Sequence, residues 1–120
     1  MTTLISLQAA EALAIVASEW FKAARRLLRL TQEALPARLD RERALLSYTQ
    51  SKIEAVLTNH GIRLVTHDGA EFSAQIPAEP VNPEDFDSDE GLVVGETLEP
   101  TVIFDGRVIA RGLVVLVRGE

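Results

Sequence analysis

Cysteine is absent from this 120-residue chain, aromatic residues are few, and the apolar N-terminal stretch is interrupted by charge. Without cysteine the chain has no disulfide framework, no thiolate nucleophile and no thiolate metal ligand. Its two histidines, His60 and His67, are too few nitrogen ligands for a zinc site. The sequence has no glycine-rich phosphate loop and no nucleophile elbow. We therefore expect no metal, no cofactor and no enzymatic activity.

Basic residues are the minority. The chain has 18 acidic and 12 basic residues, a net charge of −6 and a pI near 4.9, so on average it repels phosphate backbones and anionic membranes. Glu11 and Glu19 interrupt the apolar N-terminal stretch, which has no basic leader and therefore does not fit a signal peptide or a membrane span. We expect a cytoplasmic protein without a nucleic-acid or membrane partner.

Glycine and proline are both missing from residues 4–34, where Ala, Leu, Glu, Arg and Lys dominate. This composition predicts an uninterrupted helix. Six apolar residues recur in it at alternating spacings of three and four, as expected where helices pack side by side at shallow angles. These residues form the predicted dimer stripe: Leu13, Val16, Trp20, Ala23, Leu27 and Leu30.

Two arrangements would cover the dimer stripe. The next helix of the same chain would fold back over it, or a second copy would complete it. We favour a homodimer, because so long a stripe exceeds what one short following helix covers. Both arrangements can hold together, and two long and two shorter helices would then form a four-helix bundle across a two-fold axis. We assign Trp20 to this packing rather than to ligand stacking.

Pro36 ends the first predicted helix, because it lacks the N–H and clashes with the preceding turn. Apolar residues resume at helical spacing from Leu39 to Leu57, and Gly61 suits the left-handed position that follows a helix. The sequence thus predicts a second, shorter helix of about five turns. We interpret residues 1–60 as a helical dimerisation region.

Residues 61–120 predict a small β domain, which makes the fold class α+β. Two short strands are expected at 62–65 and 72–76, joined by the turn-forming residues 67–69, and another at 92–94. Residues 77–91 are rich in Pro, Asp and Glu, which predicts an exposed and mobile acidic loop.

Four carboxylates in and after this acidic loop nearly reproduce the ligand spacing of a calcium-binding loop: Asp85, Asp87, Asp89 and Glu96. The sixth position, normally glycine, is Glu90, and no flanking helices are expected, because Pro83 lies upstream and a β-prone run follows. We interpret the segment as a solvated acidic loop.

The pair Asp105-Gly106 lies between two runs of β-branched residues. A type I′ turn needs a positive φ at both central residues, and Asp-Gly tolerates it, so this pattern predicts a β-hairpin. We expect paired strands at 101–104 and 107–109. After them, Gly112 redirects the chain into a further strand at 113–117.

The same C-terminal stretch resembles a known family. The segments ETLEP (96–100), DGRVI (105–109) and LV (113–114) keep, without a gap, the spacing of the C-terminal signature of the GrpE family. These proteins are nucleotide exchange factors of the DnaK heat-shock chaperone. The family's Gly-Tyr is Thr101-Val102 in this chain, and its Arg-Pro-Ala is 110–112, Ala-Arg-Gly.

Upstream segments are also similar to this family. They are LP at 35–36 followed by RAL at 43–45, VLTNHGI at 56–62, and GAEF at 69–72. The family's D-P-x-x-H after the last segment is absent, and 73–77 reads SAQIP instead. The N-terminal helix is also shorter than is usual in the family, so functions of a longer stalk should be reduced or absent.

The resemblance implies a homodimer with a helical stalk and bundle, from which a small β domain projects. That domain would dock on the ATPase domain of a DnaK-type chaperone and promote ADP release. Carried over residue by residue, the resemblance implies partner contacts by Arg43, Arg107 and Leu116. From its position alone, Arg107 would protect a sheet edge against aggregation.

The alternative function is a dimeric GrpE-like adaptor or structural protein without exchange activity. A hydrolase or small-ligand domain is disfavoured, because no polar residues of the sequence converge on one site.

Overall fold

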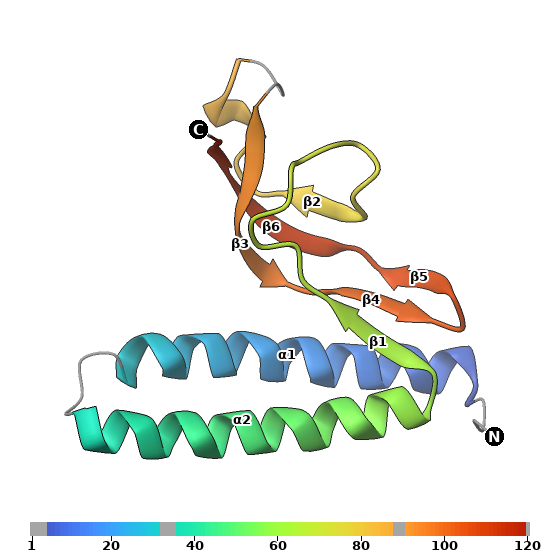
Figure 1. The fold of residues 1–120 in the computed structure, drawn as a ribbon. Coiled ribbons are helices and arrows are strands. Elements are labelled where there is room, and N and C mark those ends of the chain that lie inside the picture. The colour runs from blue at the N-terminus through green and yellow to red at the C-terminus, as the bar shows by residue number, and fades with distance from the viewer. Residues whose placement is uncertain (1–4, 32–35, 88–90, 120) are drawn as a thin grey trace. The chain divides into compact units, whose positions relative to one another are not determined.

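The computed structural model describes residues 5–31, 36–87 and 91–119. Two helices are followed by six strands (Figure 1), so the predicted α+β class is confirmed. The chain divides into two units, Met1–Arg63 and Leu64–Glu120, which we call the helical unit and the β unit. The helical unit contains α1, Leu7–Thr31, and α2, Pro36–Asn59, and β1 leads from it into the β unit.

The first helix begins at a side-chain cap. The Ser6 hydroxyl accepts a hydrogen bond from the Ala9 N–H at 3.1 Å, which satisfies one of the free donors of the first turn. No glycine or proline follows until after Thr31, where the described part of α1 ends. Residues 32–34 of the predicted helix, and Leu35 before the predicted break, lie outside the described residues.

The second helix begins at Pro36, where a fixed φ and a missing N–H suit the first helical position. It has 24 residues against 25 in α1, so it is longer than predicted and the two helices are nearly equal. Gly61 follows with a φ of +77°, as expected for a residue that ends a helix in the left-handed region. The two helices pack side by side and antiparallel (Figure 1).

The strands form two three-stranded sheets, ordered β1-β4-β5 and β2-β6-β3. In the second sheet β2 is parallel to β6 and β3 is antiparallel to it. The bounds are Ile62–Val65 for β1, Ala78–Pro80 for β2, Leu92–Glu99 for β3, Thr101–Phe104 for β4, Arg107–Ala110 for β5 and Gly112–Arg118 for β6.

The predicted hairpin is confirmed. Asp105 and Gly106 have φ values of +51° and +76°, as a type I′ turn requires, and Phe104 pairs with Arg107 across the turn. Because β5 is the last strand in its sheet, Arg107 begins an edge strand.

The core of the β unit lies on one face of the β2-β6-β3 sheet. Five buried residues form it, and three half-buried aromatic or aliphatic side chains pack against it: Ala78, Leu92, Val94, Val114 and Leu116, with Phe72, Ile76 and Phe86. The alternation of buried and half-buried residues along β6 follows from the two-residue period of a strand.

The predicted strand at 72–76 is wrong. The Ser73 hydroxyl accepts from the Gln75 N–H at 3.3 Å, and the Ser73 carbonyl accepts from the Ile76 N–H at 3.1 Å. These local bonds turn the backbone and compete with an extended strand. Phe72 and Ile76 still reach the core, but from a turn.

The prediction of a mobile loop over residues 77–91 is wrong for its first part. Ala78 is buried in β2, and the Val81 N–H donates to the Val114 carbonyl at 2.9 Å. The Asn82 side chain then makes both a donor and an acceptor bond with the backbone of Leu116, at 3.0 and 2.9 Å. After the short 3₁₀ helix η1, Pro83–Asp85, Phe86 packs on the core. The composition of residues 77–91 does not predict these contacts, because only a few apolar residues and the side-chain amide of Asn82 make them.

Candidate functional site

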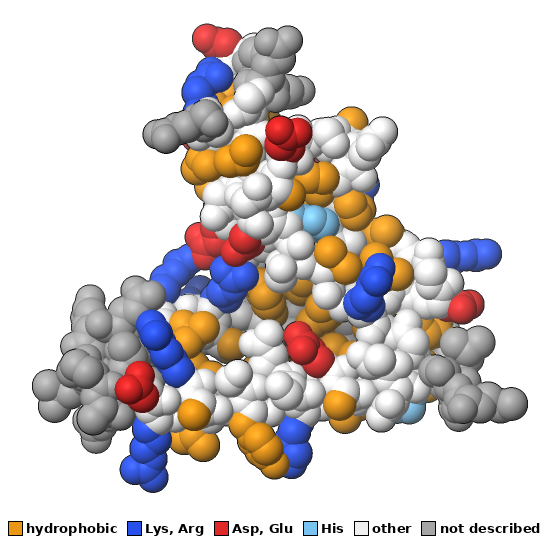
Figure 2. All heavy atoms as spheres, viewed as in Figure 1, with side chains coloured by type: hydrophobic (Ala, Val, Ile, Leu, Met, Phe, Trp, Pro, Cys, Tyr) orange, Lys and Arg blue, Asp and Glu red, His pale blue; other side chains and the backbone are white. Residues whose placement is uncertain are grey.

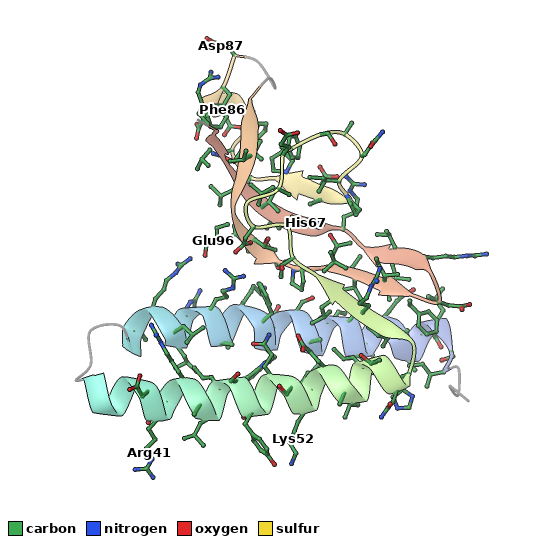
Figure 3. All side chains as sticks on the ribbon, viewed as in Figure 1. Arg41, Lys52, His67, Phe86, Asp87 and Glu96 are labelled. Atoms are coloured by element: carbon green, nitrogen blue, oxygen red, sulfur yellow. The ribbon has the colours of Figure 1, made fainter. Side chains whose placement is uncertain are left out.

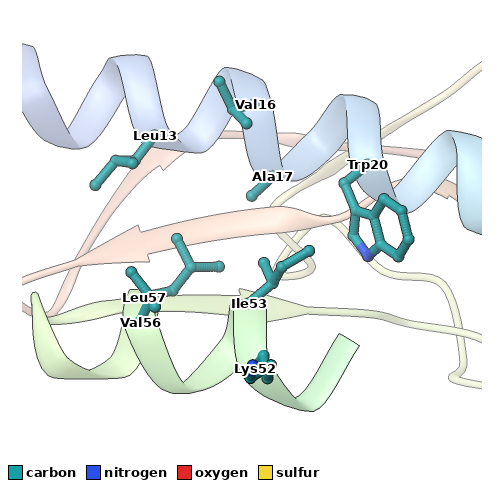
Figure 4. Close-up of a pocket in the computed structure, with 8 residues that line it drawn as sticks. All are labelled: Leu13, Val16, Ala17, Trp20, Lys52, Ile53, Val56 and Leu57. Carbon is teal, nitrogen blue, oxygen red and sulfur yellow. The ribbon is translucent and has the colours of Figure 1, made fainter. Parts of the chain in front are cut away.

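An apolar groove runs between the two helices of the helical unit. It has a volume of about 250 Å³, and α1 and α2 contribute four residues each (Figure 4): Leu13, Val16, Ala17, Trp20, Lys52, Ile53, Val56 and Leu57. We call this feature the interhelical groove. Ala17 and Leu57 lie at its base, because both are buried.

The predicted dimer stripe borders this groove and is mostly exposed in the single chain. Leu13 and Trp20 are half-buried, and the Ala23 position is exposed. Val16 is 66% exposed, Leu27 45% and Leu30 65%. Large apolar side chains with this exposure on one face of a helix indicate an interaction surface.

The second helix adds a matching row that sequence reasoning missed. Leu45, Tyr48 and Val56 are all exposed, and their spacings of three and eight place them on one side of α2. Lys52, which also lines the groove, lies in the same row and is exposed (Figure 3). The spacing was visible in the sequence, but the apolar residues on the buried side of α2 mask it. In the space-filling view, hydrophobic side chains reach the surface over the helical unit (Figure 2).

One polar atom at this groove has no partner. The Trp20 indole N–H is buried and makes no hydrogen bond in the described part of the chain. A buried donor without an acceptor costs about 1–3 kcal/mol, so such groups are rare in completed cores.

Two of the three predicted partner residues are exposed. Arg43 lies on the exposed surface of α2, and Arg107 is exposed at the first position of β5, directly after the hairpin turn. Val108, the next residue of β5, is 46% exposed, and successive side chains of a strand point to opposite faces. Arginine is enriched at interface hot spots.

Leu116 does not fit a direct contact role. Its side chain is only 2% exposed and belongs to the core of the β unit. The sequence alone does not predict the burial of Leu116, because β6 is apolar at nearly every position and its inward-facing and outward-facing residues are of the same type.

His67 takes part in a polar network. From the sequence this residue was assigned only to a turn. The His67 ring Nε2 lies 2.7 Å from the Thr101 hydroxyl, and the His67 N–H donates to the Thr97 hydroxyl at 2.9 Å. Both threonines have no exposed surface. Burial lowers the pKa of His67 below its ordinary value, and the Asp68 carboxylate opposes this effect in part. The ring is therefore neutral at neutral pH.

No group of three or more His, Asp or Glu side chains is placed to hold a metal ion within residues 5–31, 36–87 and 91–119. Two members of the candidate calcium loop, Asp89 and Glu90, lie outside these ranges. In the same ranges, no helix combines the length and the apolar character that a membrane crossing requires.

Comparisons of the chain with models of protein families, with curated proteins and with solved structures found no match. The functional argument therefore depends on the residues of this chain.

Proposed function

We propose that the protein is a GrpE-like co-chaperone that binds the nucleotide-binding domain of a DnaK-type chaperone and promotes ADP release. The observation that carries the proposal is the Asp105-Gly106 hairpin, which leaves Arg107 and Val108 exposed at the position of the family's partner-binding arginine. The order of a helical hairpin followed by a small β unit, with Arg43 exposed on the second helix, supports it.

The proposed mechanism needs no catalytic residue. A partner opens a nucleotide cleft when it binds the open state more tightly than the closed state, and the shift equals this difference in affinity. Arg107 supplies a charge that is always present and donors in a fixed geometry. A chaperone carboxylate placed within reach of Arg107 only in the open state would provide this difference.

A homodimer is part of the proposal. The interhelical groove offers apolar side chains from both helices, and its exposed borders extend from Val16 to Leu30 on α1 and from Leu45 to Val56 on α2. The complementary surface in a two-fold dimer is the same surface on a second copy. Two such helical hairpins would bury both rows in a four-helix bundle.

Release of a fluorescent ADP analogue from the host's DnaK-type proteins tests the function by stopped flow. We expect the chain to accelerate release from at least one of them, and Arg107→Ala to weaken this effect by about 30-fold, the loss typical of a hot spot. Arg118→Ala is the matched control, because Arg118 is also exposed in the β unit but lies over the Phe86 ring, 5.6 Å from its centroid. An equal loss in both variants would show a general charge effect.

A dimeric adaptor without exchange activity is the second candidate. The burial of Leu116 favours it, since one of the three expected partner contacts is then missing from the surface. If the chain accelerates ADP release from none of the chaperones, the exchange function is excluded and the adaptor remains.

A further inference from the structure

We propose that His67 is a positioning residue that fixes the β4–β5 hairpin, and with it Arg107, relative to the β2-β6-β3 sheet. His67 makes one bond to each sheet. Its backbone N–H donates to the hydroxyl of Thr97 in β3, and its ring contacts the hydroxyl of Thr101, the first residue of β4. It lies in the segment after β1 (Figure 3).

The direction of the ring bond follows from the neighbouring bond. The Thr101 hydroxyl donates its single hydrogen to the Pro77 carbonyl at 2.7 Å. Its oxygen therefore accepts from His67, which places the ring hydrogen of neutral His67 on Nε2. Each polar atom of this chain of bonds has a partner, as a buried network requires.

The network reaches three elements of the second sheet. Pro77 directly precedes β2, and its carbonyl also accepts from the N–H of Gly112, the first residue of β6, at 3.0 Å. The Thr97 N–H donates to the Asp68 carboxylate at 2.7 Å, which fastens the residue after His67 to β3. The start of the hairpin is thus bound to the sheet on which the core is built.

Gly112 shows how closely the two sheets approach here. A Cβ atom at this position would lie 2.8 Å from the Thr101 hydroxyl oxygen and 3.0 Å from the Glu99 carbonyl oxygen. The hairpin therefore has little room to shift while the His67–Thr101–Pro77 bonds are intact. Without the ring bond, the Thr101 hydroxyl keeps its bond to Pro77, and the hairpin stays joined to β3 through Pro100 and to β6 through Arg111.

The functional meaning of this positioning depends on the proposed contact by Arg107, but its test needs no partner. Amide hydrogen exchange of the full chain measures the hairpin directly. We expect His67→Ala to accelerate exchange in β4 and β5 by up to about 10-fold, the effect of losing one buried hydrogen bond. Thr101→Val removes both bonds of the hydroxyl and should accelerate this exchange more. Both variants should leave the β3–β6 ladder unchanged. His67→Gln, which keeps a side-chain N–H donor, and Thr101→Ser should restore slow exchange.

His60→Ala is the control, because His60 lies at the end of α2 in the helical unit. Equal acceleration in both sheets, unfolding of the whole β unit, or no change in the hairpin would overturn the positioning role. A local effect on the hairpin without ADP release by the wild-type chain would retain this role and exclude only the exchange function.

Discussion

The helical unit and the β unit differ in which side chains they bury. Among the described residues, the buried positions of α1 are all alanine: Ala10, Ala14, Ala17 and Ala24. Eight of the eleven exposed large apolar side chains belong to α1 and α2. In the described part of the β unit three are exposed, and six large apolar side chains are buried: Leu92, Val94, Val102, Phe104, Val114 and Leu116. The β unit thus has a hydrophobic core of its own. The exposed large side chains of the helices support the proposed dimer.

Charge separates the two units as well. Met1–Arg63 has nine basic and six acidic residues, a formal charge of +3, whereas Leu64–Glu120 has three and twelve, a formal charge of −9. The net acidity of the chain therefore comes from the β unit alone. A partner with a basic surface would associate with this acidic unit fastest. Arg107 has the opposite charge to the rest of the unit, so in the proposed complex it would fix the docking position of the partner rather than raise the association rate.

The largest effect on this difference between the two units is expected from a charged substitution on the exposed side of α1. Val16 and Ile15 are neighbours and equally exposed, at 66%, but only Val16 lines the interhelical groove. We expect Val16→Glu to abolish the dimer, because an unpaired carboxylate would be buried in it, and Ile15→Glu to leave it intact. Light scattering measures the mass of each variant. A monomeric wild-type chain would contradict the dimer, and equal losses would place the interface elsewhere.

The stability of the β unit should depend on its buried side chains and not on its exposed ones. Leu116→Ala removes a buried side chain and is expected to lower the free energy of unfolding by about 2–5 kcal/mol. Arg107→Ala removes an exposed one, with an effect within about 0.5 kcal/mol. Urea denaturation followed by circular dichroism measures both. If Leu116→Ala were as mild as Arg107→Ala, the assignment of Leu116 to the core would be wrong.

Acid should weaken the β unit slightly through His67. Its pKa is lowered on folding, so the unfolded chain binds the proton more readily than the folded chain. The resulting stability is complete above the ordinary pKa of 6.5 and is lost as pH falls through the lower folded value. We expect the loss to be small, because the ring is only partly buried and solvent screens its charge.

Thermal unfolding at pH 7.5 and pH 5 measures this loss. The variant His67→Gln should show a smaller difference between the two pH values than the wild-type chain. An identical difference in both proteins would assign the acid sensitivity to other groups.

Sequence patterns predicted the elements that depend on local chemistry. The Asp-Gly turn and Gly61 after α2 were found where expected, because each needs only its own residues or immediate neighbours. The strands β1 and β4 were also found where expected, because their apolar and β-branched residues mark them as strands, although they pair with each other over a long distance in the chain. The outcome was different for β2, which exists through pairing with β6, 34 residues further along the chain at Ala78 and Gly112. No local pattern reports such pairing.

The site was predictable to a similar extent. The dimer stripe on α1 follows from its spacing, and the exposure of Arg107 follows from its place beside a turn. The burial of Leu116 depends on core residues of other strands, Ala78 in β2 and Leu92 and Val94 in β3. The bonds of His67 depend on Thr97 and Thr101, 30 and 34 positions away. Long-range contacts of this kind need the folded chain.

The single tryptophan and the single tyrosine give the molecule a built-in optical reporter. Trp20 and Tyr48 both lie in the helical unit, so ultraviolet emission follows that unit and is blind to the other. Because Trp20 lies in the interhelical groove, its spectrum should shift to shorter wavelength when a second copy excludes water from the indole ring. A dilution series followed by intrinsic fluorescence, without any label, would then report assembly of the helices, because the β strands contain neither tryptophan nor tyrosine.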